Sequence, residues 1–476
     1  MKIFNMKLIF PIIILFLFTS YSKEKETDMK DSPKLLFVFE HFRHGAREPY
    51  IKIDPITWID FIGVQWKSQG ELNSIGLRAQ YLLGAATRNR YNDFLSKTFD
   101  PNEILIISTD VNRTIVSAMA NLQGIYNKTT TPNLTDIQIN NSIINIFTET
   151  YQKERDGKID KLKNSYIETG ISIIPIHLFS KYRFLFKLSD SNYCPGIQKY
   201  KDEAKNSEAV QKILKEFYQL TNDTYGEYIF KFMNVSWEKD PNYIFEDSNL
   251  YYICDAYIAD YISGRYMPHI ENTGIDMEAF YHHALNHSMI DTYYVEYGIP
   301  PTKASYISVS PMFRSVFDYM DKRIYINEND NSDKIDKSAP KYVIYSGHDS
   351  TVGGVDVFLK AEFNISYENP EYTTSQYFEL WENGPNNYTI IYLVNQEIKA
   401  TFQYNEFKKN ILNKIIPQDE IEKICSLENN SEYDNVKIIK KQNIFKKIFF
   451  IVVSIGIVSL LLIFSLLVLD NKRKQY

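Results

Sequence analysis

Cysteine is scarce in this chain: three cysteines occur among 476 residues, at Cys194, Cys254 and Cys425. So few cysteines exclude a small scaffold that is held together by many disulfides. In an oxidising compartment they predict one disulfide and one free thiol, and the count alone leaves the pairing open. Most of the stability must therefore come from a hydrophobic core, and an apolar content of 44% is enough for one.

The sequence also lacks a large excess of charge of either sign. Its net charge of -6 at pH 7 argues against general binding to nucleic acids. The zinc-binding HExxH motif is absent too: His283 and His287 are four residues apart and follow His282, but neither that glutamate nor a third ligand accompanies them. We therefore expect no metal and no other cofactor, and we interpret these histidines as packed or surface residues.

The longest apolar runs lie at the two ends of the chain. Lys2 and Lys7 precede or border an apolar run of 11 residues, Leu8 to Phe18. This layout is typical of a secretory signal peptide that is cleaved, here near Ser22. At the other end, Ile448 to Leu469 form 22 residues without a charge, and about 20 apolar residues are enough to cross a bilayer.

Together these segments predict a single-pass type I membrane protein. Its body would lie in a lumen or outside the cell, with a few residues in the cytoplasm. The alternative is a lipid-anchor signal whose tail is removed, but the basic residues Lys472 to Lys474 after the apolar run argue against it. Ten N-x-S/T sequons fit secretory export, although each alone is weak evidence in an Asn-rich chain. They lie at Asn112, Asn127, Asn133, Asn140, Asn222, Asn234, Asn286, Asn364, Asn387 and Asn429.

Three short apolar segments predict buried strands, and each ends in a loop rich in groups that suit phosphate. The carboxyl ends of neighbouring parallel strands meet at one edge of a sheet, so we expect the three loops to share a pocket. An ordinary basic surface loop is the alternative for the first of them. The strands and the loop residues after them are Leu35–Phe39 with Arg43, His44 and Arg47, Glu103–Ser108 with Arg113, and Lys341–Tyr345 with His348 and Asp349.

Residues beside these loops indicate how they are built. Gly45 would let the backbone approach a ligand closely. We expect Asn73 or Ser74 to cap the helix that follows the first loop, and Thr109 or Asp110 to cap the helix after the second.

The loop side chains match what the cleavage of a phosphate ester requires. A neutral imidazole can attack phosphorus and form a phosphohistidine. Arginine and histidine side chains can hold the phosphate oxygens as their charge redistributes. The departing alkoxide needs a proton, and Asp349, beside His348, is the candidate acid.

Four blocks of the sequence resemble the histidine acid phosphatases, the branch of the histidine phosphatase superfamily that includes acid phosphatases and phytases. The RHGxRxP signature matches 43–49, and the Gly-x-Leu-x-x-x-Gly pattern matches 70–76. The Ser-Thr-Asp-x-x-Arg-Thr block matches 108–114, and the His-Asp pair matches 348–349. The similarity extends from about Leu35 to Cys425, with a poorly matched middle. The signal peptide, the single span and the short tail most resemble the membrane-bound lysosomal-type acid phosphatases.

The resemblance implies a role for each matching residue. His44 would be the nucleophile that becomes phosphorylated, and Asp349 would protonate the leaving oxygen. The phosphate would be bound by Arg43, Arg47, Arg113 and His348.

The resemblance also implies a disulfide between Cys194 and Cys425. Relatives carry more cysteines, and the position that matches the usual partner of Cys254 falls near Ser375, so we expect Cys254 to be a free thiol. The sequon at Asn112 lies inside an active-site block, and we expect it to carry no glycan.

The expected fold is α/β, with a mixed, mostly parallel central sheet flanked by helices and a mainly α-helical inserted domain. Two segments, Gln376–Glu382 and Tyr388–Asn395, predict a hairpin, and Phe402–Ile416 predicts a last helix. The predicted boundaries are signal peptide 1–22, first part of the phosphatase core 32–150, helical insert 151–335, second part of the core 336–428, stalk 429–447, transmembrane helix 448–469 and cytoplasmic tail 470–476.

The sequence thus predicts an acid phosphatase that hydrolyses phosphomonoesters through a phosphohistidine. The runner-up is a phytase or inositol-polyphosphate phosphatase of the same superfamily. A third hypothesis is an inactive, membrane-anchored glycoprotein that keeps the fold for binding, which is disfavoured because all six site positions carry the family residue. The expected partners are a small phosphomonoester and the membrane, and a homodimer is left open.

Overall fold

The computed structural model describes residues 33–49, 69–126, 135–141, 153, 156–158, 173–178, 190–232, 247–264, 274–329, 339–367 and 369–426. The predicted signal peptide, stalk, transmembrane helix and cytoplasmic tail lie outside these residues. None of the helices described has the length and apolar character that a membrane span requires.

The described strands and helices alternate through the first and last parts of the chain, and helices dominate the middle. In order they are β1 (Lys34–Arg43), α2 (Ser74–Arg90), β2 (Ile104–Ser108), α3 (Asn112–Ile125), α4 (Asp136–Asn141), β3 (His177–Leu178), α6 (Ile197–Lys205), α7 (Glu208–Phe232), α8 (Asp247–Ile262), α10 (Met277–Met289), the π-helix η3 (Ile290–Val295), α11 (Lys303–Glu328), β4 (Tyr342–Gly347), α12 (Asp349–Phe363), β5 (Ser375–Glu382), β6 (Tyr388–Val394), β7 (Glu397–Gln403), α13 (Tyr404–Leu412) and α14 (Gln418–Cys425).

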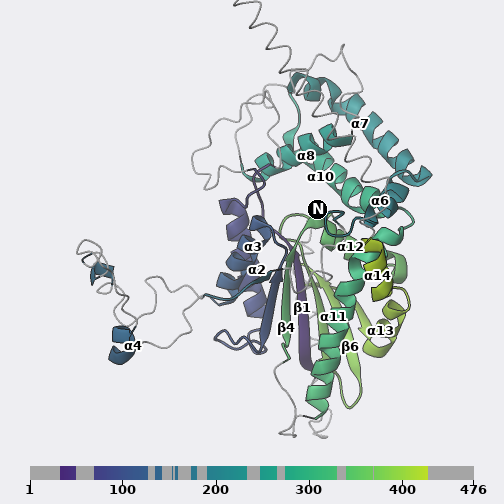
Figure 1. Cartoon of the computed structure of the whole chain (residues 1–476). Coiled ribbons are helices and arrows are strands. Elements are labelled where there is room, and N and C mark those ends of the chain that lie inside the picture. Colours follow the sequence, from purple (N-terminus) through teal and green to yellow (C-terminus); the bar gives the residue numbers. More distant parts are fainter. Residues whose placement is uncertain are drawn as a thin grey trace, which may run out of the picture.

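A seven-stranded mixed sheet lies at the centre, in the order β3-β2-β4-β1-β5-β6-β7 (Figure 1). On one side of β1 the pairs β1–β4, β4–β2 and β2–β3 are parallel. On the other side β1–β5, β5–β6 and β6–β7 are antiparallel, so antiparallel pairing is more extensive than we predicted. The predicted hairpin is confirmed as β5 and β6.

The apolar run of β1 is buried on both faces of the sheet. Phe37 and Phe39 pack in a core cluster that includes residues of α11 and α12. Val38 and Phe42 face the opposite cluster, which includes residues of α3. Helices on both faces explain why this strand is continuously apolar instead of alternating. The long helix α11 falls within the predicted insert by position, yet its residue Phe313 packs against the sheet.

The predicted last helix, Phe402–Ile416, is wrong at both ends: it ends at Leu412, and α14 follows it. Phe402 belongs to β7, where it pairs with Ile390, and the helix begins at Tyr404. A two-residue turn joins β6 to β7, with Asn395 and Gln396 at φ angles of 49° and 68°. The turn lacks the glycine that usually marks such a hairpin, which is why the sequence pattern missed the strand.

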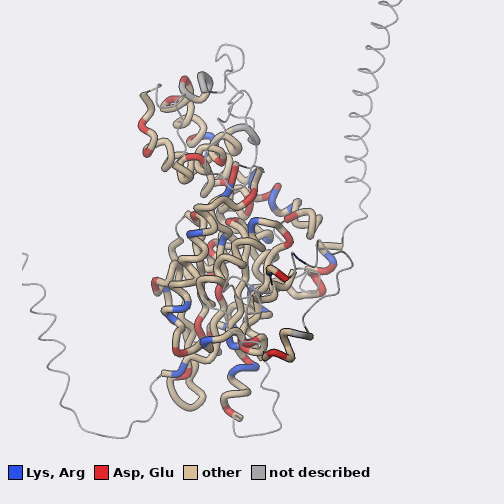
Figure 2. The backbone as a smooth tube through the Cα atoms, turned by 90° about the vertical axis from the view of Figure 1, so that its left-hand side faces the viewer, with Lys and Arg blue, Asp and Glu red and all other residues tan. Residues whose placement is uncertain are grey.

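The helices α7, α8 and α10 lie together beyond one end of the sheet (Figure 1). They share a core that includes Phe217, Tyr257 and Phe280. The predicted disulfide is present between Cys194 and Cys425, while Cys254 is a buried free cysteine. Acidic and basic residues are interspersed along the described chain (Figure 2).

Two carboxyl groups are buried beside the sheet among tyrosine hydroxyls. Glu40, 0% exposed, accepts hydrogen bonds from Tyr342 (2.6 Å) and Tyr377 (3.2 Å). Asp356 accepts one from Tyr293 (2.9 Å). Burial raises the pKa of each carboxyl to about 7, against the opposing effect of these hydrogen bonds.

We expect these carboxyls to make the fold more stable in acid. The pKa of each carboxyl is higher in the folded state than in the unfolded state. Their contribution to the free energy of unfolding is therefore complete below the unfolded-state pKa and is lost as the pH rises through about 7. The free energy of unfolding should therefore decrease less between pH 5 and 7.5 in Glu40→Gln than in the unmodified protein, by up to about 3 kcal/mol. Urea unfolding at both pH values measures this, with the exposed Glu397→Gln as control. An unchanged pH dependence in Glu40→Gln would contradict it.

Candidate active site

The loop after β1 is held in place by a close approach of two glycine backbones. A Cβ atom on Gly45 would lie 2.5 Å from the carbonyl oxygen of Gly76, and one on Gly76 would lie 2.1 Å from that of Ala46. The predicted cap is confirmed as Asn73, whose side chain accepts from the Gly76 N–H. Gly45 thus allows the loop to pack against the start of α2. We had expected it to allow the backbone to approach a ligand.

His44 is buried in this loop and has a defined tautomer. Its Nδ1 lies 2.9 Å from the carbonyl oxygen of Gly45. A carbonyl can only accept, so Nδ1 carries the hydrogen and Nε2 keeps its lone pair. Burial, and after it the positive charges of Arg113 and Arg43, hold the pKa of His44 well below its usual value. The ring is therefore a neutral imidazole with a free nucleophilic nitrogen.

The other two predicted loops meet the first one. The carboxyl ends of β2, β4 and β1 are neighbours, and Arg43 pairs with Gly347 in register. The rings of His44 and His348 are 5.6 Å apart, edge to face. From the second loop, Nη2 of Arg113 lies 3.4 Å from Nδ1 of His348. Residues more than 200 positions apart in the sequence thus form one cluster.

Arg43 connects the first loop to Asp349. Its Nη2 lies 2.7 Å from a carboxylate oxygen of Asp349, and its Nη1 donates to the carbonyl of Pro370 at 2.6 Å. The guanidinium also stacks over the ring of Tyr372, 4.4 Å from its centroid. Burial alone would raise the pKa of Asp349, but Arg43, and after it the charged form of His348, lower it to about 2. This carboxyl is therefore ionised.

Arg47 is oriented by a residue that the sequence motifs did not reveal. Its two terminal nitrogens lie 2.6 and 3.2 Å from the carboxylate oxygens of Asp255, a bidentate pair. Asp255 lies on α8, in the part of the chain where the family resemblance is poor. Arg47 is 4% exposed, and its charge acts on His44.

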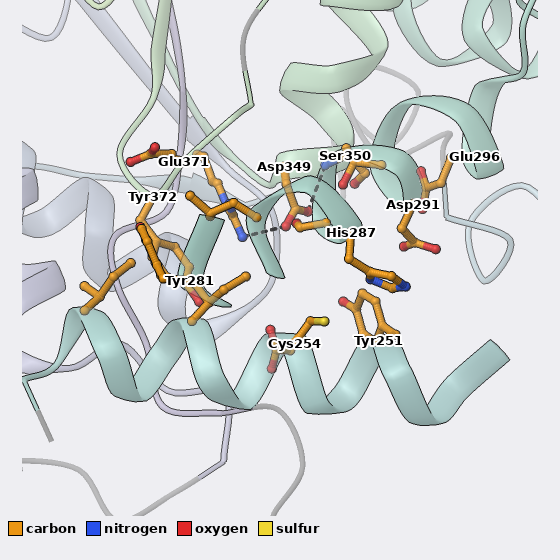
Figure 3. A pocket seen from close by; sticks show the side chains of 17 residues that line it. Tyr251, Cys254, Tyr281, His287, Asp291, Glu296, Asp349, Ser350, Glu371 and Tyr372 are labelled. Atoms are coloured by element: carbon orange, nitrogen blue, oxygen red, sulfur yellow. Dashed lines mark hydrogen bonds and ion pairs between the residues drawn. The ribbon is translucent and has the colours of Figure 1, made fainter. Parts of the chain in front are cut away.

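A cavity opens beside Asp349 and is bounded on its other side by α8 (Figure 3). Aromatic and apolar residues, among them Tyr251, Tyr281 and Tyr372, form part of its wall. Arg43 is the one arginine or lysine among the described lining residues. Carboxyl groups are more numerous there: Asp255, Asp291, Glu296, Asp349 and Glu371.

The histidines of α10 have different surroundings. His283 stacks on Phe217 and its Nε2 lies 2.8 Å from the Thr221 hydroxyl, while His287 lines the cavity. In the described part of the chain, no group of three or more His, Cys, Asp or Glu residues is arranged to hold a metal ion. The expected cap of α3 is wrong: its N-cap is Val111, without a side-chain bond, and Thr109 turns instead towards His348.

The chain is similar to several known proteins. The family model for the histidine phosphatase superfamily (branch 2) matches residues 34–395. Prostatic acid phosphatase of Mus musculus is 39% identical over 102 residues, 21% of this chain and 26% of that protein. Lysosomal acid phosphatase of Xenopus laevis is 37% identical over 98 residues, 21% of this chain and 22% of that protein. The matched segment thus spans about a quarter of the length of these relatives.

A solved phytase structure from Citrobacter braakii is also similar, with 12% identity and a TM-score of 0.49, covering 83% of this chain and 100% of that chain. The family that the four sequence blocks suggested is confirmed by the family match, which extends over most of the chain. The protein belongs to branch 2 of the histidine phosphatase superfamily.

Proposed function

We propose that the protein is an acid phosphatase that hydrolyses phosphomonoesters through a phosphohistidine on His44. The observation that carries this proposal is the state of His44: a buried, neutral imidazole whose Nδ1–H is bound to its own loop, beside several positive charges. Such a nitrogen is nucleophilic, and the nearby cations favour the approach of a phosphate.

In the first step, Nε2 of His44 attacks phosphorus and the bond from phosphorus to the ester oxygen breaks. Asp349 gives its proton to that oxygen, so the product leaves as an alcohol. In the second step, water attacks phosphorus and gives a proton to Asp349, the bond from phosphorus to Nε2 of His44 breaks, and phosphate is released. Throughout, the phosphate oxygens are held by the donors Arg43, Arg47, Arg113 and His348.

Asp349 must acquire a proton before it can act as an acid, since its ion pair with Arg43 keeps it ionised. A phosphomonoester loses its second proton near pH 6, so below that pH the substrate arrives as a monoanion that carries one. A bound phosphate also competes with Asp349 for Arg43, whose ion pair keeps the pKa of Asp349 low. Both effects move a proton to Asp349 and favour activity in acid.

His44, Arg47, Arg113 and His348 do not line the cavity beside Asp349, so the cavity bears only on the part of the substrate beyond the reacting phosphate. There its lining favours esters of a single phosphate over inositol polyphosphates, the runner-up substrate. A polyphosphate needs several cationic donors around its additional phosphates. Beyond Arg43, the described lining supplies carboxyl groups, such as Asp291 and Glu296, and tyrosines.

Trapping the intermediate tests the proposal. The purified full-length protein, turning over p-nitrophenyl phosphate labelled on phosphorus at mildly acidic pH, should carry acid-labile label on His44. A panel with inositol hexakisphosphate should show a much higher kcat/KM for the monoester. Full activity without label would refute the mechanism. Binding without any turnover would favour the inactive glycoprotein, and a preference for the hexakisphosphate would favour a phytase.

We further propose the predicted topology for the whole chain: a type I membrane protein whose phosphatase body lies in a lysosome-like lumen or outside the cell. The apolar run at 448–469 supports the single span, and the run at 8–18 supports the signal peptide. The disulfide between Cys194 and Cys425 fits an oxidising compartment.

A further inference from the structure

We propose that Thr109 is a positioning residue that fixes the tautomer of His348, so that anion binding takes up a proton at Nδ1 of His348. Thr109 and His348 are far apart in the sequence, and the pairing of β2 with β4 brings them together. The inference rests on the proposed function only in placing an oxyanion beside His348, and it is tested by binding alone.

Thr114 lies at the far end of a chain of hydroxyl groups that leads through Thr109 to His348. The Thr114 hydroxyl lies 2.8 Å from the carbonyl oxygen of Val111 and 3.0 Å from that of Thr109. Carbonyl oxygens only accept, so we assign the single hydrogen of Thr114 to these two contacts and not to the Thr109 hydroxyl. Both threonines are 0% exposed, which excludes water as a competing partner.

The direction of every other bond follows from this one. The hydroxyls of Thr109 and Thr114 are 2.7 Å apart, and Thr114 has no second hydrogen, so Thr109 donates to it. Thr109 has then used its own hydrogen and must accept from Nε2 of His348, at 2.9 Å. The relay therefore places the hydrogen of a neutral His348 on Nε2.

The other ring nitrogen gives an independent check. Nη2 of Arg113 lies 3.4 Å from Nδ1 of His348, and a guanidinium can only donate. The lone pair that the relay assigns to Nδ1 therefore faces a donor. The two sides of the ring thus require the same tautomer.

This tautomer has a consequence for anion binding. An oxyanion between Arg113 and His348 needs a donor at Nδ1, but Nε2 already holds its hydrogen for Thr109. His348 can then donate at Nδ1 only as an imidazolium, which requires one proton from solvent. Charged or titratable groups that face this site are Arg43, His44 and Arg47 from the first loop, Arg113 from α3 and Asp349 from α12.

Thr109→Val removes the acceptor while keeping the shape of the side chain. Neutral His348 is then free to place its hydrogen on Nδ1 and to bind the anion without a proton. Sulfate is a suitable probe because it resembles phosphate and does not titrate between pH 4 and 8. Isothermal calorimetry in buffers of different ionisation enthalpy counts the protons taken up.

We make the comparison in a His44→Ala background, which removes the neighbouring imidazole. His44→Ala should take up about one proton more than His44→Ala with Thr109→Val. Over the pH range where His348 changes charge, the Kd of His44→Ala for sulfate should rise about tenfold per pH unit. The double variant should show a smaller rise of Kd with pH. Thr109→Ser, which keeps the hydroxyl, should behave like threonine.

Equal proton uptake with Val or Thr at position 109 would overturn the proposal. If Thr109→Val does not fold, Thr114→Val provides the same test. It frees the Thr109 hydrogen for Nε2 of His348 and should likewise remove about one proton. Loss of sulfate affinity without a change in proton uptake would also overturn it, because that result indicates a purely structural role. None of these outcomes depends on turnover, so a failed phosphatase assay leaves this test intact.

Discussion

His44→Ala should lower kcat for p-nitrophenyl phosphate by at least about 10³-fold, because it removes the nitrogen that we propose as the nucleophile. The bound phosphate would still meet the same arginines, so KM should change far less than kcat. Label trapped from substrate should disappear together with the activity. Stopped assays at mildly acidic pH, with the acid-labile label counted in parallel, measure both effects.

His282→Ala is the matched control, since His282 is exposed on α10 and does not line the cavity beside Asp349. It should keep the activity and the label of the unmodified protein. Circular dichroism and sulfate binding should show that His44→Ala is folded and retains its anion site. A His44→Ala enzyme with nearly normal kcat would rule out His44 as the nucleophile.

Asp349→Asn is expected to slow the hydrolysis of alkyl phosphates by about 10² to 10⁴-fold. An alkoxide is a poor leaving group and depends on the proton from Asp349. p-Nitrophenolate departs readily without a proton, so its release should slow far less. The measurement is kcat for a series of esters whose alcohols differ in acidity, and the variant should show the steeper dependence.

The Asn side chain has nearly the same volume as Asp but cannot form the ion pair with Arg43. Asp110→Asn serves as the control, because Asp110 is an exposed carboxyl in the second loop. An equal loss for every ester would mean that Asp349 positions Arg43 and donates no proton to the leaving group.

Much of the site was predictable because its residues lie in short, ordered blocks. The loops after β1, β2 and β4 each follow an apolar strand, and parallel pairing alone brings their ends together. Asp255 and Tyr372 were not predicted. They reach Arg47 and Arg43 only through the packing of α8 and the segment before β5, and neither belongs to a local motif.

The extent of the sheet was harder to predict than its centre. β7 follows a turn without glycine, and its exposed edge position leaves no clear alternation in the sequence. The cap of α3 was predicted from a local rule, since Thr109 stands where capping residues usually stand. The nearby ring of His348 provides a competing partner, and that contact exists only after β2 and β4 have paired.

By itself, the sequence determined the family, the positions of the chemical groups and the strands that carry them, because each depends on residues close together in the chain. Tertiary structure decided the protonation of those groups. The neutral state of His44, the ionised state of Asp349 and the relay from Thr109 to His348 all arise from burial and from charges that distant segments bring within a few ångströms. Electrostatic energy depends on distance in space, and the sequence does not contain that distance.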